Sequence, residues 1–118
     1  MKEVISLAEK YKDYFKIGAA INPHVLNTSR ELIKKHFNSI TAENEMKPIS
    51  LNREKGKFAF EVADAMINFA KENNMVVRGH TLVWHNQTPD HLFLDEDGSF
   101  VSKEVLEERL REYTRTVF

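Results

Sequence analysis

The sequence contains no cysteine, which excludes disulfide bonds and thiolate zinc sites. It also lacks an excess of charge, because 17 basic residues face 18 acidic ones. The net charge of −1 gives no electrostatic case for a nucleic acid or acidic membrane partner. No apolar stretch approaches the ~18–20 residues of a membrane span. A soluble protein without a nucleic acid partner is therefore expected.

The first residues, MKEVIS, include no apolar segment long enough for a signal peptide. We therefore expect either a cytoplasmic protein or the mature form of a secreted one. The 118 residues have a mass of 13.8 kDa, are 42% hydrophobic and 30% charged, and show no repeat or linker. This size and composition predict one globular domain over residues 1–118.

Glycine is scarce, and the four glycines are scattered at positions 18, 56, 79 and 98. No phosphate-binding glycine loop is present, which disfavours a nucleotide-binding fold. Short apolar runs at residues 17–21, 39–42 and 75–84 predict three strands, and helical patterns separate them. This alternation predicts an α/β fold with a parallel sheet, either a doubly wound open sheet or part of a (β/α)₈ barrel. A complete barrel needs roughly 250 residues.

Helix starts and stops are also visible in the sequence. Two capping boxes, Ser6-x-x-Glu9 and Thr28-x-x-Glu31, predict helix starts, and Ser102 predicts the cap of a last helix. The helical spacing of apolar residues is clearest over residues 60–70. A turn at residues 95–98 predicts a small hairpin between 92–94 and 99–101.

Polar side chains follow the second and third predicted strands, where α/β folds bind ligands. Glu43, Asn44 and Lys47 follow the second strand. In the third strand the period of two places His80 and Trp84 on one face. Carboxylate, amide, ammonium and imidazole groups together suit a ligand rich in hydroxyls. A tryptophan ring suits the C–H face of a sugar, so we expect a carbohydrate ligand.

Residues 40–47 (ITAENEMK) and 78–89 (RGHTLVWHNQTP) resemble the second- and third-strand motifs of family 10 glycoside hydrolases. Residues 16–20 (KIGAA) resemble that family's first strand, and residues 56–58 (GKF) resemble its loop before the second helix. The likeness runs over essentially all 118 residues in the same order. It implies an endo-1,4-β-xylanase with a (β/α)₈ TIM barrel, of which this chain would be the N-terminal segment with about three βα units.

The resemblance also implies roles for individual residues. Glu43, Asn44 and Lys47 would bind sugars on the non-reducing side of the cleaved bond. His80 and Trp84 would line the subsite at that bond, and Gln87 would reach the next sugar outward. The family's two catalytic glutamates follow the fourth strand and lie on the seventh, so no catalytic residue is expected within this chain. Neither a cofactor nor a metal is implied.

The sequence departs from the family at His91, where tryptophan is usual. We expect this change to alter the packing of the loop beneath the cleft more than the sugar contacts. Within the chain, Glu43 and Glu45 are two residues apart and do not suit hydrolysis, which needs carboxylates ~5–5.5 Å apart across the bond for retention. The five-residue offset of His80 and His85 does not suit zinc, which needs three or four converging ligands.

Two hypotheses of function follow. The chain supplies the glycone-side substrate-binding half of a retaining xylanase acting on xylan or xylo-oligosaccharide, and is inactive alone. Alternatively, it is a non-catalytic carbohydrate-binding or barrel-assembly segment. In either case three strands leave open sheet edges. We therefore expect a complementary C-terminal part of the barrel, or self-association, as partner.

Overall fold

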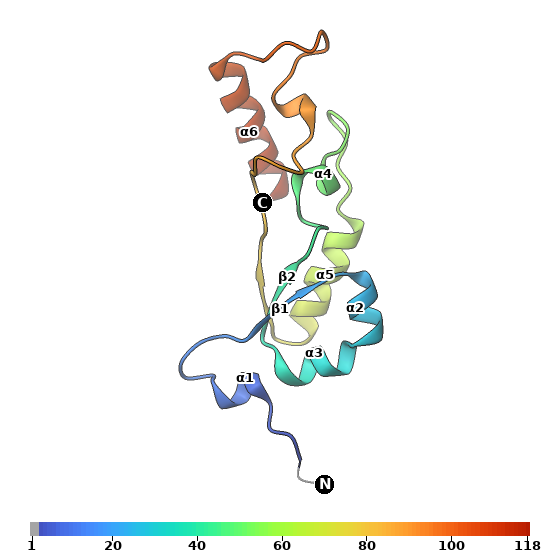
Figure 1. Ribbon diagram of the computed structural model, residues 1–118, viewed down its shortest axis with the longest axis vertical. Coiled ribbons are helices and arrows are strands. Elements are labelled where there is room, and N and C mark those ends of the chain that lie inside the picture. Colours follow the sequence, from blue (N-terminus) through green and yellow to red (C-terminus); the bar gives the residue numbers. More distant parts are fainter. Residues whose placement is uncertain (1–2) are drawn as a thin grey trace. The chain divides into compact units, whose positions relative to one another are not determined.

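The computed structural model describes residues 3–118, and its strands form one parallel sheet (Figure 1). Strands β1 (Gly18–Ile21), β2 (Ser39–Ala42) and β3 (Val76–Arg78) lie in the order β1-β2-β3. Ile21 pairs with Ala42, and Thr41 pairs with Arg78. Because all three strands run in the same direction, their carboxyl ends meet at one edge of the sheet.

The chain divides into two compact units. The sheet unit consists of Met1–Met46 and Phe60–His80, and it contains all three strands. The loop unit consists of Lys47–Ala59 and Thr81–Phe118. None of the helices in residues 3–118 is long and apolar enough to cross a membrane.

Four helices belong to the sheet unit: α1 (Leu7–Lys10), α2 (Pro23–Thr28), α3 (Arg30–His36) and α5 (Glu61–Glu72). The first capping prediction is confirmed, because the Ser6 hydroxyl accepts a hydrogen bond from the Glu9 amide at 3.2 Å. The second is wrong. Thr28 ends α2, and its hydroxyl donates to the His24 carbonyl at 3.0 Å.

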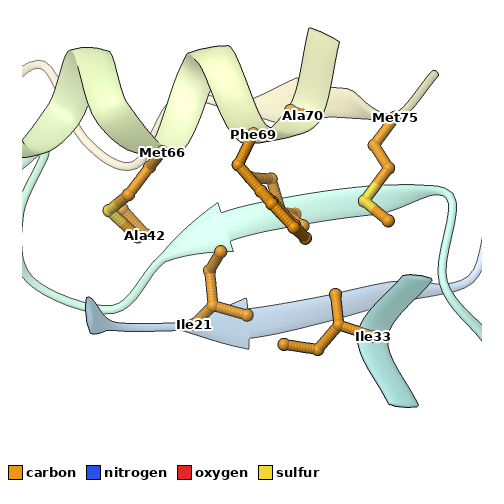
Figure 2. Close-up of a cluster of buried hydrophobic side chains, with 8 residues drawn as sticks. Ile21, Ile33, Ala42, Met66, Phe69, Ala70 and Met75 are labelled. Atoms are coloured by element: carbon orange, nitrogen blue, oxygen red, sulfur yellow. The ribbon is translucent and has the colours of Figure 1, made fainter. Parts of the chain in front are cut away.

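A core of apolar side chains lies between α5, α3 and the sheet (Figure 2). The spacing of apolar residues along α5 turns Met66, Phe69 and Ala70 toward the strands. Burial of each large side chain stabilises the fold by ~1.5–3 kcal/mol. The remaining members of this core come from β1, β2, α3 and the residue before β3: Ile21, Ile33, Ile40, Ala42 and Met75.

The third strand is shorter than predicted. The pattern predicts residues 75–84, whereas β3 covers Val76–Arg78. Its ladder with β2 ends at the Thr41–Arg78 pair, one residue before β2 itself ends. The strand-face argument that placed His80 and Trp84 together is therefore wrong, because neither residue lies in a strand.

The loop unit contains α4 (Pro48–Leu51), the 3₁₀ helix η1 (Asp90–Leu92) and α6 (Lys103–Val117). Ser102 caps α6 as predicted, with its hydroxyl accepting from the Val105 amide at 3.3 Å. The predicted hairpin is reduced to one antiparallel bridge between Leu94 and Phe100, because Leu92 belongs to η1.

Candidate functional site

In the sheet unit, candidate residues gather where the strands end. Glu43 and Asn44 directly follow β2, and His80 comes two residues after β3. The Glu43 amide donates to the Ile21 carbonyl at 2.8 Å, which continues the β1–β2 ladder past the last paired residues. The parallel sheet therefore brings Glu43, Asn44 and His80 to the same edge, as the sequence predicts. Glu43 and Asn44 are exposed, and His80 is half-buried.

Asn22 holds the Glu43 side chain in place. Its amide nitrogen donates to Glu43 Oε2 at 2.7 Å, and its Oδ1 accepts from the Val25 amide at 2.8 Å. A single side chain thus caps α2 and orients a candidate ligand-binding carboxylate. In the sequence, Asn22 and Pro23 directly follow the strand predicted at residues 17–21. An Asn-Pro pair after a strand is a recognisable helix-start signal.

Glu45 serves the local turn. Its Oε2 accepts a hydrogen bond from the Asn44 amide at 3.0 Å. This contact gives Glu45 a structural role in the turn and gives no support to a catalytic pair with Glu43. In residues 3–118 no group of three or more histidine, aspartate or glutamate side chains is placed to hold a metal ion.

In the loop unit, Lys47 and Trp84 are in contact. The Lys47 side chain is buried, with 8% of the residue exposed, and its Nζ lies 5.2 Å from the centre of the Trp84 ring. An ammonium over an indole face is stabilised by ~0.5–2 kcal/mol, more as water is removed. Lys47 immediately precedes Pro48, the first residue of α4, and its carbonyl accepts from the Ser50 amide at 2.9 Å.

Gln87 has an unusual backbone. Its φ of 53° lies in the left-handed region, which costs an L-residue other than glycine ~1–2 kcal/mol. Neighbouring bonds stabilise this turn: Asn86 Oδ1 accepts from the Gln87 amide at 2.8 Å, and the Thr88 hydroxyl donates to the Trp84 carbonyl at 2.7 Å. The Gln87 carbonyl accepts from the Ile49 amide at 3.0 Å. Strain of this kind often marks a functional segment.

The loop unit therefore brings together the three other candidates. Lys47 touches Trp84, and Gln87 is bound to the helix that starts next to Lys47. An ammonium, an indole and an exposed amide can bind hydroxyls and stack on a sugar ring. The sequence indicated these residues but not the hydrogen bonds that position them. A backbone hydrogen bond such as that from Ile49 to Gln87 does not depend on side-chain identity, so the sequence does not reveal it.

The model of glycosyl hydrolase family 10 matches residues 6–118. The chain belongs to this family. Its sheet is the N-terminal portion of the family 10 (β/α)₈ barrel, which confirms the predicted fold class and excludes the doubly wound alternative. The order β1-β2-β3 alone does not separate the two, because half of a doubly wound sheet has the same order.

Curated members of family 10 resemble the chain throughout. Endo-1,4-beta-xylanase A of Thermotoga maritima is 58% identical, over 98% of this chain and 12% of that protein. Endo-1,4-beta-xylanase A of Caldicellulosiruptor saccharolyticus is 49% identical, over 96% of this chain and 33% of that protein. The crystal structure of xylanase XynB from Paenibacillus barcinonensis, complexed with a conduramine derivative, superposes with a TM-score of 0.94 at 44% identity. The match covers 99% of this chain and 35% of that one. The chain thus spans about a third or less of these relatives.

Proposed function

We propose that this chain supplies the glycone-side substrate-binding part of an endo-1,4-β-xylanase that acts on xylan or xylo-oligosaccharide. The observation that carries this proposal is the buried Lys47 ammonium over the Trp84 ring, within motifs of a family whose similar members are named xylanases. A buried lysine is expensive unless its charge has partners. A preformed, half-dehydrated cation beside an aromatic face is suited to binding sugar hydroxyls.

The six candidate residues receive distinct roles in this proposal. Residues that precede α4 bind the sugars on the non-reducing side of the cleaved bond: Glu43, Asn44 and Lys47. Of the other three, His80 and Trp84 line the subsite at that bond, and Gln87 reaches the next sugar outward. Glu43 offers acceptors, Asn44 and Gln87 offer both donors and acceptors, and together they match hydroxyls that also do both.

The proposed reaction is a two-step retaining hydrolysis through a covalent glycosyl-enzyme. Its acid/base and nucleophilic glutamates lie outside residues 1–118, after the fourth strand and on the seventh. Both units then belong to one catalytic domain. The 118 residues bind and orient substrate, while bond cleavage requires the rest of the barrel.

The proposed partner is the complementary C-terminal part of the barrel, with self-association as the alternative. In residues 3–118, β1 and β3 each pair with one neighbouring strand, which leaves one open edge on each. Open edges and exposed apolar side chains favour association. In the sheet unit Tyr14 and Phe15 are 80% and 57% exposed, and in the loop unit Phe100 is 84% exposed.

Titration with xylotetraose tests the proposed function directly. The 118-residue chain, alone and mixed with a complementary C-terminal segment, is compared with its Lys47→Met and Glu45→Gln variants. We expect Lys47→Met to weaken binding by about tenfold, or ~1.4 kcal/mol, and Glu45→Gln to have little effect. Methionine keeps most of the apolar stem, so the loss isolates the charge.

Hydrolysis distinguishes the two hypotheses of function. The chain alone should release no reducing sugar from xylan, at the same background as its Glu43→Ala variant. The mixture should gain turnover if the complement restores a catalytic domain. Sugar binding without any gain from a complement would favour a purely carbohydrate-binding segment. Turnover by the chain alone would require a catalytic residue within it and would contradict the proposal.

A further inference from the structure

The C-cap of α4 is a junction of hydrogen bonds within the loop unit. Asn52 is buried, and its side-chain nitrogen donates to the carbonyls of Glu54 at 3.2 Å and Lys57 at 2.8 Å. Its own carbonyl lies 2.7 Å from His91 Nε2. A carbonyl can only accept, so the imidazole carries its proton at Nε2 and donates. His91 therefore binds the end of the helix that begins beside Lys47.

Arg109 fixes the backbone on which His91 is mounted. Its Nη1 donates to the His91 carbonyl at 2.8 Å and to the Leu94 carbonyl at 3.0 Å. Its Nη2 is 2.6 Å from Asp95 Oδ1. The guanidinium is largely buried, with 19% of its side chain exposed, and its planar fork fixes three acceptors together. His91 therefore lies on a stretch of backbone, within η1, that Arg109 holds in place.

Two hydrogen bonds join α4 to the segment around Gln87, and they lie on opposite sides of buried Pro89. The Ile49 amide binds the Gln87 carbonyl before Pro89, and His91 Nε2 binds the Asn52 carbonyl after it. One bond alone leaves rotation about it, whereas two bonds fix the relative orientation. Lys47 and Trp84 stand at the start of these two segments and touch each other.

We propose that His91 is a positioning residue for sugar binding, because its Nε2–H holds α4 against the turn that carries Trp84 and Gln87. This inference rests on the proposed function. His91 is not one of the six residues proposed to bind the sugar. Its effect is transmitted through Asn52 and α4 to Lys47. The bond, and not the bulk of the imidazole, is the source of the effect.

Three substitutions at position 91 separate the bond from the bulk. The amide nitrogen of glutamine lies about as far from the backbone as His91 Nε2 does. The amide nitrogen of asparagine lies only as far out as Nδ1, and alanine has no donor. In the 118-residue chain we expect His91→Gln to bind xylotetraose within about twofold of the parent. His91→Asn and His91→Ala should bind about tenfold more weakly, equivalent to about 1.4 kcal/mol.

Two measurements without sugar test the same inference independently. Trp84 is the only tryptophan, so its fluorescence should change in the alanine and asparagine variants and not in the glutamine variant. Hydrogen exchange at the Ile49 amide should accelerate about tenfold in the same two variants, as expected for a loss of about 1.4 kcal/mol. The Phe69 amide in the sheet unit serves as the internal control for folding.

The outcomes are distinguishable. If the parent chain binds no xylotetraose while exchange and fluorescence follow the donor, the proposed function fails, and His91 still positions α4 against the turn that carries Trp84 and Gln87. If the glutamine variant behaves as the alanine variant does, or if all three behave as the parent, the positioning role is overturned. If alanine unfolds the loop unit, rescue by glutamine and failure of asparagine still decide the question.

Discussion

The sheet unit and the loop unit position their candidate residues by different physical means. In the sheet unit, a buried apolar core under parallel strands places Glu43 and His80 at a shared edge. In the loop unit, polar side chains bind backbone carbonyls and hold short segments, as Arg109 and Asn52 do. Apolar burial specifies a general position, whereas directional hydrogen bonds specify an orientation.

This difference predicts different responses to substitution. Removing core volume should lower stability by several kcal/mol, because a cavity remains where contacts were. Removing one hydrogen-bonding group should cost about 1 kcal/mol, since water competes for such bonds. Sugar binding should nevertheless be sensitive to the second kind of change, because it depends on the orientation of single side chains.

Phe69→Ala should produce the largest effect. Phe69 is 4% exposed in the core of the sheet unit, so we expect a loss of ~3–5 kcal/mol in the free energy of unfolding. Phe69→Leu, which keeps most of the apolar volume, should lose less than ~1.5 kcal/mol. Urea denaturation followed by circular dichroism measures both. Val62→Ala on the same helix is the control, because Val62 is 48% exposed and should change little.

Hydrogen exchange locates the damage from Phe69→Ala. The amides of β2 should lose protection more than those of α6 if the sheet unit depends on this core. Equal loss of protection in both elements would show that the two units unfold as one and would remove the contrast between them.

Substitutions of Asn22 separate capping from orientation of Glu43. Asn22→Ala should cost ~1 kcal/mol of stability, because α2 loses its cap, and should weaken xylotetraose binding by several-fold. Asn22→Ser keeps an acceptor for the Val25 amide but is too short to donate to Glu43. It should preserve stability and still weaken binding. Calorimetry for binding and thermal melts for stability check both; unchanged binding in the serine variant would mean that Asn22 does not orient Glu43.

The sequence predicts some elements of the sheet unit better than others. The strand at Ser39–Ala42 and the apolar face of α5 follow from periodic patterns, and the structure confirms both. The end of β3 could not be predicted, because residues 79–84 remain strand-like in sequence. The strand ends with its ladder to β2 at the Thr41–Arg78 pair, and pairing between such distant segments leaves no local signal in the sequence.

Helix caps show the same limit at the level of single residues. Thr28 matches a capping box, but α2 already includes it, and its hydroxyl binds a carbonyl within the helix. His91 is visible in the sequence only as a departure from the family. Its bond to Asn52 joins residues 39 positions apart, which no local pattern can indicate.

Left-handed backbone offers a matched test across the two units. Asn74 in the sheet unit and Gln87 in the loop unit have φ values of 54° and 53°. Asparagine adopts this conformation more readily than glutamine does. We expect Gln87→Gly to raise stability by ~0.5–1 kcal/mol, because glycine removes the cost of the left-handed conformation but loses more backbone entropy on folding. Asn74→Gly should change stability by only a few tenths of a kcal/mol. Chemical denaturation measures both; equal changes would contradict a specific strain at Gln87.

Tyr113→Phe should have the smallest effect at neutral pH. Tyr113 is 2% exposed in the loop unit, and its buried hydroxyl has no hydrogen-bond partner among residues 3–118. Removing an unpaired buried hydroxyl is nearly neutral or slightly stabilising, by ~0.5 kcal/mol. A loss of more than about 1 kcal/mol would show that the hydroxyl is hydrogen-bonded after all.

The pH dependence of the same variant gives the sharper test of burial. Burial raises the pKa of Tyr113 from 10.0 to about 12. The unfolded chain therefore releases this proton first, so the contribution of Tyr113 is complete below pH 10 and is lost as the pH rises toward 12. The difference between the parent and Tyr113→Phe cancels the contributions of all other groups. We expect the parent to lose more stability than the variant over this interval; parallel curves would mean that the phenol is accessible to water in the folded loop unit.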